Sequence, residues 1–200
     1  HDMQREYQVL EKLRPHFGLC PRPLLYADDT RIVGSPFYIM ERMRGIILRK
    51  DLPAGLNLSP RDCQQLCRRF VAVFSDLHAI DCRSSGLANL GKPQGYVERQ
   101  VRGWSGRYRD ARTEDAPDFE AVMAWLAAHM PPDARRPAVV HNDFRFDNLV
   151  LAPDDPLTII GVLDWELATI GHPLMDLGNS LAYWVQADDP EEMQLLRLMP

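Results

Sequence analysis

Three short apolar runs, separated by polar residues, lie between residues 138 and 165. The runs are Ala138–Val140, Leu149–Leu151 and Thr158–Leu163, and Pro153-Asp154-Asp155-Pro156 separates the last two. Short apolar runs bounded by turn residues are typical of buried strands, and the proline–aspartate sequence favours a tight turn. This stretch therefore predicts strands with polar residues at their ends, where functional residues tend to concentrate.

The remaining sequence predicts a mainly helical scaffold. Ser59-Pro60-Arg61-Asp62 is a strong helix start, because Ser59 can cap, proline suits the first helical position and Asp62 favours the first turn. This helix is expected to continue to about Leu77. Further helices are expected over residues 2–14, 96–109, 118–129, 173–185 and 191–198, and two strands over 24–27 and 32–40. The order of elements indicates an α+β fold.

Composition excludes several classes of protein. Of 200 residues, 46% are hydrophobic and 26% are charged, as in a soluble globular protein; this length suits one domain, or two lobes packed as one. No window approaches the roughly eighteen apolar residues of a membrane span, and the N-terminus opens no signal-peptide pattern. The net charge of −5 argues against general nucleic-acid binding. Four cysteines without zinc or redox spacing predict free thiols. We expect a cytoplasmic protein with neither membrane nor nucleic-acid partners.

Positive charge comes mainly from arginine, since the chain has only three lysines. Several arginines crowd one predicted helix: Arg99, Arg102, Arg107, Arg109 and Arg112. The first interpretation is a solvated helix face, and the alternative is an anion-binding patch for a phosphorylated substrate. The aromatic residues between them are expected to be partly buried against neighbouring helices: Tyr96, Trp104 and Tyr108.

The polar residues between the predicted strands have the pattern that phosphoryl transfer requires. Asp143 follows His141 by two residues and precedes Asn148 by five, and Asp164 follows the next hairpin. Phosphoryl transfer needs a base for the attacking hydroxyl and oxygen ligands for magnesium ions that bridge phosphates. Asp143 suits the first role, and Asn148 with Asp164 suits the second.

Two segments carry a family resemblance. His141-Asn142-Asp143-Phe144-Arg145-Phe146-Asp147-Asn148 and Leu163-Asp164-Trp165-Glu166 resemble the catalytic loop and metal-binding segment of the aminoglycoside and choline kinase-like phosphotransferases, relatives of protein kinases. The sequence is most similar to the kinase-like domains fused to acyl-CoA dehydrogenases and to their stand-alone bacterial relatives, through residues 35–43 and 163–173. The resemblance covers essentially the whole chain.

The resemblance implies a protein-kinase-like, two-lobed α+β fold. Residues 1–43 would form the end of an N-terminal β lobe and the hinge, and residues 44–200 would form most of a helical C-terminal catalytic lobe, incomplete at its end. The implied activity is transfer of the ATP γ-phosphate to a hydroxyl of a small molecule, with Mg²⁺. Arginines on the acceptor side would suit an anionic acceptor of the hydroxyacyl-CoA type better than a polycationic aminoglycoside.

The resemblance also implies roles for residues outside the central motif. Met40–Met43 would form the hinge, where the carbonyl of Glu41 and the amide of Met43 meet adenine. Glu6 would pair with a lysine that anchors the α- and β-phosphates. Asp176 would brace the catalytic loop through backbone hydrogen bonds.

Three residues beside the motif keep more than one interpretation. His141 is expected to orient the loop rather than to transfer protons. Arg145 could offset charge on the transferring phosphoryl group as a catalytic residue, or form a structural salt bridge to Asp147 or Glu166. Glu166 could support the metal site from behind or contact the metal.

The sequence departs from the family pattern in one respect. No lysine lies upstream of Glu6, and no glycine-rich nucleotide loop occurs. We therefore expect the sequence to be a portion of a longer chain, with little or no turnover in isolation, and appreciable kinase activity of the isolated chain would contradict this. Two other functions remain open: a pseudokinase-like binding or regulatory domain, and a metal-dependent phosphohydrolase using Asp143, Asp164 and His141, which the asparagine disfavours.

Overall fold

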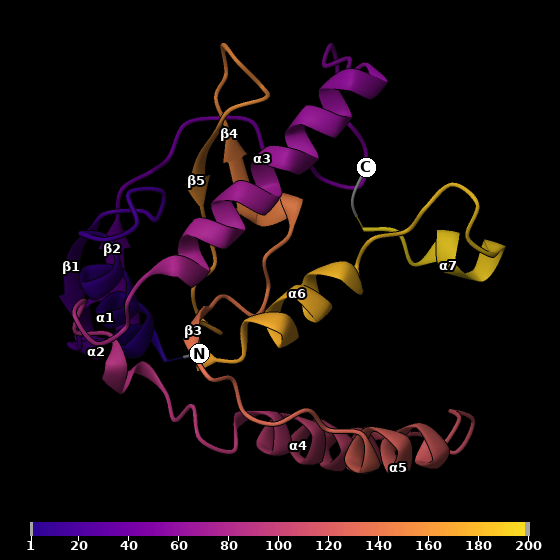
Figure 1. Ribbon diagram of the computed structural model, residues 1–200. Coiled ribbons are helices and arrows are strands. Elements are labelled where there is room, and N and C mark those ends of the chain that lie inside the picture. Colours follow the sequence, from indigo (N-terminus) through magenta and orange to yellow (C-terminus); the bar gives the residue numbers. More distant parts are fainter. Residues whose placement is uncertain (1, 199–200) are drawn as a thin grey trace.

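The computed structural model describes residues 2–198 (Figure 1). Helix α1 (Met3–Leu13) packs against an antiparallel pair of strands, β1 (Pro23–Ala27) and β2 (Phe37–Met40). Asp2 caps α1, because its side chain accepts the N–H of Arg5 at 2.9 Å. The buried side of α1 carries Val9, Leu10 and Leu13 into the core.

One predicted strand is partly wrong. Residues 32–36 do not extend β2, because a single helical turn, α2 (Thr30–Val33), precedes that strand. Asp29 caps this turn by accepting the N–H of Arg31 at 2.9 Å, and Gly34 ends it with a φ of 88°. A glycine adopts this left-handed conformation without steric cost. The turn chemistry therefore outweighed the β propensity of Ile32 and Val33.

The long helix α3 (Pro60–Ala79) forms one wall of the core. It begins with a full capping box, in which Ser59 and Asp62 each accept a hydrogen bond from the backbone of the other. Phe70 and Phe74 lie on its buried side and contact the ring of Phe144, with centroids 4.7 and 4.4 Å away. Aromatic pairs at this spacing add stability beyond the area that they bury.

Helices α4 (Tyr96–Ala111) and α5 (Glu120–Ala128) form a hairpin along one side of the molecule (Figure 1). A 3-10 turn, η1 (Ala88–Leu90), precedes them. At their surface, the Arg109 guanidinium joins the two helices by donating two hydrogen bonds to the Glu120 carboxylate, each 2.7 Å long. Trp104 is 63% exposed, so the expectation that it packs against a neighbouring helix is wrong.

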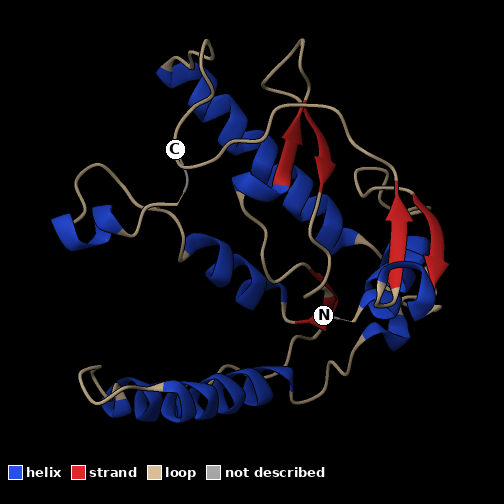
Figure 2. Cartoon of the chain, turned by 180° about the vertical axis from the view of Figure 1, so that it is seen from behind, coloured by secondary structure: helices blue, strands red, loops and turns tan. Residues whose placement is uncertain are grey.

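Two small antiparallel sheets carry the central motif (Figure 2). Strand β3 (Ala138–Val140) pairs with β6 (Thr169–Gly171), and β4 (Leu149–Leu151) pairs with β5 (Ile159–Val162). The predicted strands at 138–140 and 149–151 match the structure, whereas β6 was not predicted. Another 3-10 turn, η2 (Phe146–Asn148), leads into β4.

Two helices complete the described chain: α6 (Pro173–Leu181) and α7 (Glu191–Leu195). Both end before their predicted limits. After α6 the chain turns, and the Trp184 ring packs on Phe70 with the centroids 5.6 Å apart. No helix in the described part of the chain is long and apolar enough to cross a membrane.

The segment that follows β2 passes close to the hairpin of β4 and β5. Ile46 forms an isolated antiparallel bridge with Leu151, with both N–H to O distances below 3 Å. At Gly45 an added Cβ would lie 2.3 Å from the carbonyl oxygen of Leu151 and 2.5 Å from a Val150 methyl group. This close approach requires glycine. The division at residue 43 stays a prediction.

Replacing Gly45 by alanine should therefore destabilise the protein by about 1–3 kcal/mol, because backbone must move to admit the methyl group. Gly106 offers a matched control, since it lies inside α4 with nothing within 4 Å of the added carbon. Gly106→Ala should instead raise stability by up to about 1 kcal/mol through helix propensity. Urea denaturation of both variants measures the difference, and an unchanged midpoint for Gly45→Ala would contradict the argument.

Candidate active site

The predicted catalytic loop follows directly from β3. Asn142 has a φ of 63°, so the chain turns sharply between His141 and Asp143. Asparagine tolerates this left-handed conformation better than most residues. Its side chain is held from both ends, because Nδ2 donates to the carbonyl oxygen of Leu167 at 2.9 Å and Oδ1 accepts the Tyr96 hydroxyl at 3.0 Å.

His141 is fully buried behind the loop. Its Nδ1 accepts the N–H of Asp143 at 3.2 Å, and its Nε2 lies 2.9 Å from the carbonyl oxygen of Leu163. These partners fix the tautomer, with the proton on Nε2. Burial lowers the pKa of the imidazole, although the nearby carboxylate of Asp176 opposes the shift. His141 therefore joins the loop to the segment before Asp164 as a neutral group, which suits orientation rather than proton transfer.

The side chain of Asp143 is positioned by two donors. Asn148 donates through Nδ2 both to the Asp143 carboxylate at 2.9 Å and to its backbone oxygen at 2.8 Å. Arg145 forms an ion pair with the same carboxylate at 2.9 Å and lies 3.3 Å from Asp147. The Arg145 guanidinium also lies over the ring of Tyr183, 4.5 Å from its centroid. The structure thus contains the salt bridge to Asp147, one of the alternatives for Arg145, together with a pairing with Asp143 that the sequence did not suggest.

Asp164 lies near Asp143 and Arg145, because it follows the end of β5 by two residues. The N–H of Leu163 donates to the backbone oxygen of Asn148 at 2.8 Å, which brings the two segments together. Asp164 has a φ of 66°, and the indole of Trp165 behind it donates to Val162 at 2.8 Å. Burial raises the pKa of the Asp164 carboxyl, and the charges of Glu166 and Asp143 raise it further.

Glu6 reaches the same region from α1. Its pKa is raised first by burial, and then by the charges of Asp164 and Glu166, while a hydrogen bond with Tyr38 lowers it. These carboxylates repel one another in partly buried surroundings, and each would be stabilised by a nearby cation. Arg5, also on α1, contacts the same segment. Its guanidinium donates a hydrogen bond to the carbonyl oxygen of Glu166 at 2.9 Å, a contact absent from the sequence predictions.

The donor set fits magnesium. With Nδ2 of Asn148 engaged by Asp143, its Oδ1 remains for a ligand, and Asp164 supplies a carboxylate whose pKa is raised by burial and by the charges of Glu166 and Asp143. Mg²⁺ prefers such hard oxygen ligands, and water and substrate phosphates commonly complete its shell. Within residues 2–198 no group of three or more His, Cys, Asp or Glu residues could hold a metal, so these two residues would act with substrate.

Asp176 fixes the loop from the side of α6. Its buried carboxylate accepts the N–H of His141 at 2.8 Å and that of Asn142 at 2.7 Å. His78, in the last turn of α3, adds a third contact at 2.9 Å. The sequence predictions omitted His78, although its position one turn after Phe74 places it on the buried side of the helix. Asn179, also omitted, donates to the carbonyl oxygen of Asn142.

The residues implied to meet adenine lie where β2 ends. The N–H of Glu41 donates to the carbonyl oxygen of Arg22 at 2.8 Å. The side chain of Met43 packs against Gly161 in β5, where an added Cβ would lie 2.5 Å from its sulfur. The segment from Met40 to Met43 thus runs beside the strand that leads to Asp164, and its contact with adenine stays a prediction.

A cavity of about 640 Å³ opens next to the catalytic loop, between α4 and α6. Its lining consists of Tyr96, Gln100, Trp104, Arg107, Asn142, Leu167, Thr169, Leu174, Met175, Gly178 and Asn179. We call it the α4–α6 cavity. Arg107 lies over the Trp104 ring, 4.7 Å from its centroid, and the lining contains no carboxylate. The other arginines of α4 fit the first interpretation better: Arg102 pairs with Glu98, and Arg109 pairs with Glu120.

Comparison with known proteins decides the family. Residues 1–196 match the model of the phosphotransferase enzyme family. The chain belongs to this family. It is 37% identical over 185 residues to human acyl-CoA dehydrogenase family member 11, and this alignment covers 92% of this chain and 23% of that protein. It is 36% identical over 197 residues to mouse acyl-CoA dehydrogenase family member 10, and this alignment covers 95% of this chain and 18% of that protein. The chain therefore spans about a quarter or less of these relatives.

Solved structures confirm the predicted kinase-like α+β fold. A Ralstonia eutropha protein assigned to the aminoglycoside phosphotransferases aligns with a TM-score of 0.80 and 34% identity, covering 94% of this chain and 56% of that one. An aminoglycoside 2′-phosphotransferase solved with GDP aligns with a TM-score of 0.63 and 18% identity, over 91% and 63% of the two chains. The second likeness concerns the fold alone.

The contacts of Asp176 generate a prediction about the catalytic loop. Asp176→Asn replaces one of two accepting oxygens by an NH₂ group that faces a backbone N–H, at a cost of about 1–3 kcal/mol. Hydrogen exchange at the amides of His141 and Asn142 should accelerate markedly. Asp154→Asn, in the exposed β4–β5 turn, serves as the control and should leave these amides unchanged. Equal protection in both variants would show that Asp176 does not brace the loop.

Proposed function

We propose that this chain forms the catalytic part of a phosphotransferase that moves the γ-phosphate of ATP to a hydroxyl group of a small molecule, with Mg²⁺. The observation that carries the proposal is the placement of Asp143, held by Asn148 and Arg145, beside Asp164. Membership of the phosphotransferase enzyme family supports it. The GDP complex of a protein with the same fold also supports nucleotide binding in this family.

Each residue of the site has its own role in the proposed reaction. Asp143 would accept the proton of the attacking hydroxyl, and its two donors keep the carboxylate in one orientation. Asn148 and Asp164 would hold magnesium, which would offset negative charge on the phosphates. Arg145 lies next to the base, where it could also stabilise charge on the transferring group.

The α4–α6 cavity is the proposed acceptor site. Asn142 lines it and is adjacent to Asp143, so an acceptor there would lie beside the base. Its lining combines apolar side chains with Arg107 and lacks carboxylates, which suits an apolar or anionic acceptor and does not suit a polycation. The names of the acyl-CoA dehydrogenase relatives are consistent with an acceptor of the hydroxyacyl-CoA type.

A binding or regulatory domain without turnover is the second candidate. Turnover in the complete protein separates these two candidates, because only a kinase transfers phosphate.

A thermal-shift measurement separates the proposed kinase from a metal-dependent phosphohydrolase. Metal alone would stabilise a phosphohydrolase, whereas the proposed kinase needs nucleotide with metal.

Asp143→Ala in the complete protein that carries this chain should lower kcat by at least about 10²-fold, since positioned general-base help is of that size or larger. ATP binding should change little, because Asp143 is assigned to the acceptor hydroxyl. Steady-state kinetics and nucleotide titration check both parts. Retention of kcat would remove the catalytic assignment.

The acceptor assignment predicts that an acyl-CoA binds the chain and that Arg107→Gln weakens this binding several-fold. Loss of one charged contact of about 1–2 kcal/mol gives that factor. Arg112→Gln, at the end of the same helix, is the matched control, because Arg112 does not line the cavity. Isothermal titration calorimetry measures both variants. Tight binding of an aminoglycoside without binding of acyl-CoA would overturn the assignment.

A further inference from the structure

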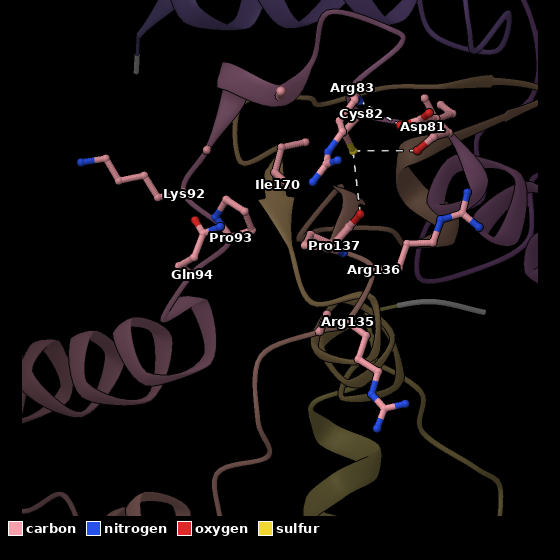
Figure 3. Close-up of a pocket in the computed structure, with 14 residues that line it drawn as sticks. Asp81, Cys82, Arg83, Lys92, Pro93, Gln94, Arg135, Arg136, Pro137 and Ile170 are labelled. Carbon is pink, nitrogen blue, oxygen red and sulfur yellow. Dashed lines mark hydrogen bonds between the residues drawn. The ribbon is translucent and has the colours of Figure 1, made fainter.

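A second cavity lies at the opposite end of β3 from the catalytic loop. It has a volume of about 590 Å³ and is formed by residues 80–83 after α3, residues 91–94 before α4 and residues 134–137 before β3. We call it the basic cavity (Figure 3). Ile170 of β6 lies in its wall, paired with Val139 in the middle of β3. His141, where the catalytic loop begins, follows the other end of this strand, so the two sites are separate.

The charge of the basic cavity is unusual for this chain. Four cationic side chains line it, Arg83, Lys92, Arg135 and Arg136, against one acidic side chain, Asp81, whereas the whole chain carries a net charge of −5. Arg83, Lys92 and Arg135 make no side-chain hydrogen bond or ion pair with other residues of the described part, 2–198. Their charges are available to a ligand.

Figure 3 shows how these groups lie. The Arg83 guanidinium points toward Ile170 and Pro137, while the side chains of Lys92, Arg135 and Arg136 extend outward from the wall in different directions. Guanidinium groups recognise phosphate through paired N–H donors, and a lysine adds a mobile positive charge. The inward Arg83 can therefore contact a phosphate group directly, and the other three cations add positive charge around that position.

The walls of the cavity are fixed by contacts among its three segments. The Asp133 carboxylate accepts the N–H of Gly95 at 2.6 Å, which connects the segment before β3 to the start of α4. Arg136 donates to the carbonyl oxygen of Ala79 at 3.1 Å, which ties the same segment to the end of α3. Arg99 donates to the carbonyl oxygens of Lys92 and Gln94. The cavity is therefore present without a ligand, so little ordering would oppose binding.

The size and the remaining lining define the class of ligand. A volume of about 590 Å³ is typical of sites for organic molecules and far exceeds the needs of a bare phosphate ion. Apolar groups contribute much of the wall, namely Ile80, Ala88, Pro93, Pro137 and Ile170. We propose that the basic cavity binds an organic phosphate, with Arg83 on the phosphate group, the positive charges of Lys92, Arg135 and Arg136 near it, and the apolar wall against the organic part. This site does not depend on the function proposed for the catalytic loop.

The test uses phenyl phosphate, which combines a phosphate with an apolar ring, and inorganic phosphate for comparison. Calorimetric titrations are run at low ionic strength with EDTA, so that no metal-dependent binding at the catalytic loop contributes. Phenyl phosphate should bind more tightly than inorganic phosphate. Arg83→Gln combined with Arg135→Gln should raise its Kd by about tenfold or more. Both side chains are exposed, so the fold should be retained.

Two controls make the outcome specific. Arg61→Gln combined with Arg68→Gln removes the same charge from exposed positions of α3 and should change Kd less than about twofold. Asp143→Asn should leave phenyl phosphate binding intact. No binding by the unaltered chain, equal losses in both double variants, or loss of binding in Asp143→Asn would each overturn the proposal.

Hydrogen exchange on the unaltered chain locates the ligand without any variant. Phenyl phosphate should slow exchange in residues 80–83 and 134–137 and leave residues 141–148 unchanged. Protection confined to the catalytic loop would place the ligand there and overturn the proposal.

Discussion

The buried carboxylate of Asp176 is the contact on which the arrangement of the site depends. A carboxylate removed from water is costly unless donors surround it, and this one faces the N–H groups of His141 and Asn142 and the imidazole of His78. It thereby joins α6, the start of the catalytic loop and the end of α3 at one point. Asn142 can keep its left-handed conformation because Asp176 accepts its N–H and Asn179 donates to its carbonyl oxygen. Its side chain is held separately by Leu167 and Tyr96.

The loop in turn determines where the negative charges lie. Burial raises the pKa of Asp164 and of Glu6, and neighbouring charges raise both further, those of Glu166 and Asp143 for Asp164 and those of Asp164 and Glu166 for Glu6. Arg145 compensates one of them directly. Crowded carboxylates of this kind would be stabilised by a nearby cation, which is the physical basis for the magnesium site proposed above. The two cavities on either side of the start of α4 have the opposite character, since neither of them gathers carboxylates.

Much of this could be predicted from the sequence because the signals are local. The capping box at Ser59, the strands at 138–140 and 149–151 and the spacing from Asp143 to Asn148 depend on residues that are neighbours along the chain. Local signals also failed where two of them competed. At Ile32 the apolar pattern favoured a strand, yet the cap at Asp29 and the glycine at position 34 formed a helical turn.

The sequence by itself determined which groups are available: two carboxylates and an amide at fixed spacing, within a chain whose family motifs are evident. Only the tertiary structure decided their partners. The contact of His78 with Asp176, the approach of Glu6 to Asp164 and the pairing of β6 with β3 join residues far apart along the chain. Long-range contacts of this kind depend on how helices and strands pack, and no pattern within a short segment encodes them. For the same reason the basic cavity, assembled from three separate segments, could be seen only in the folded chain.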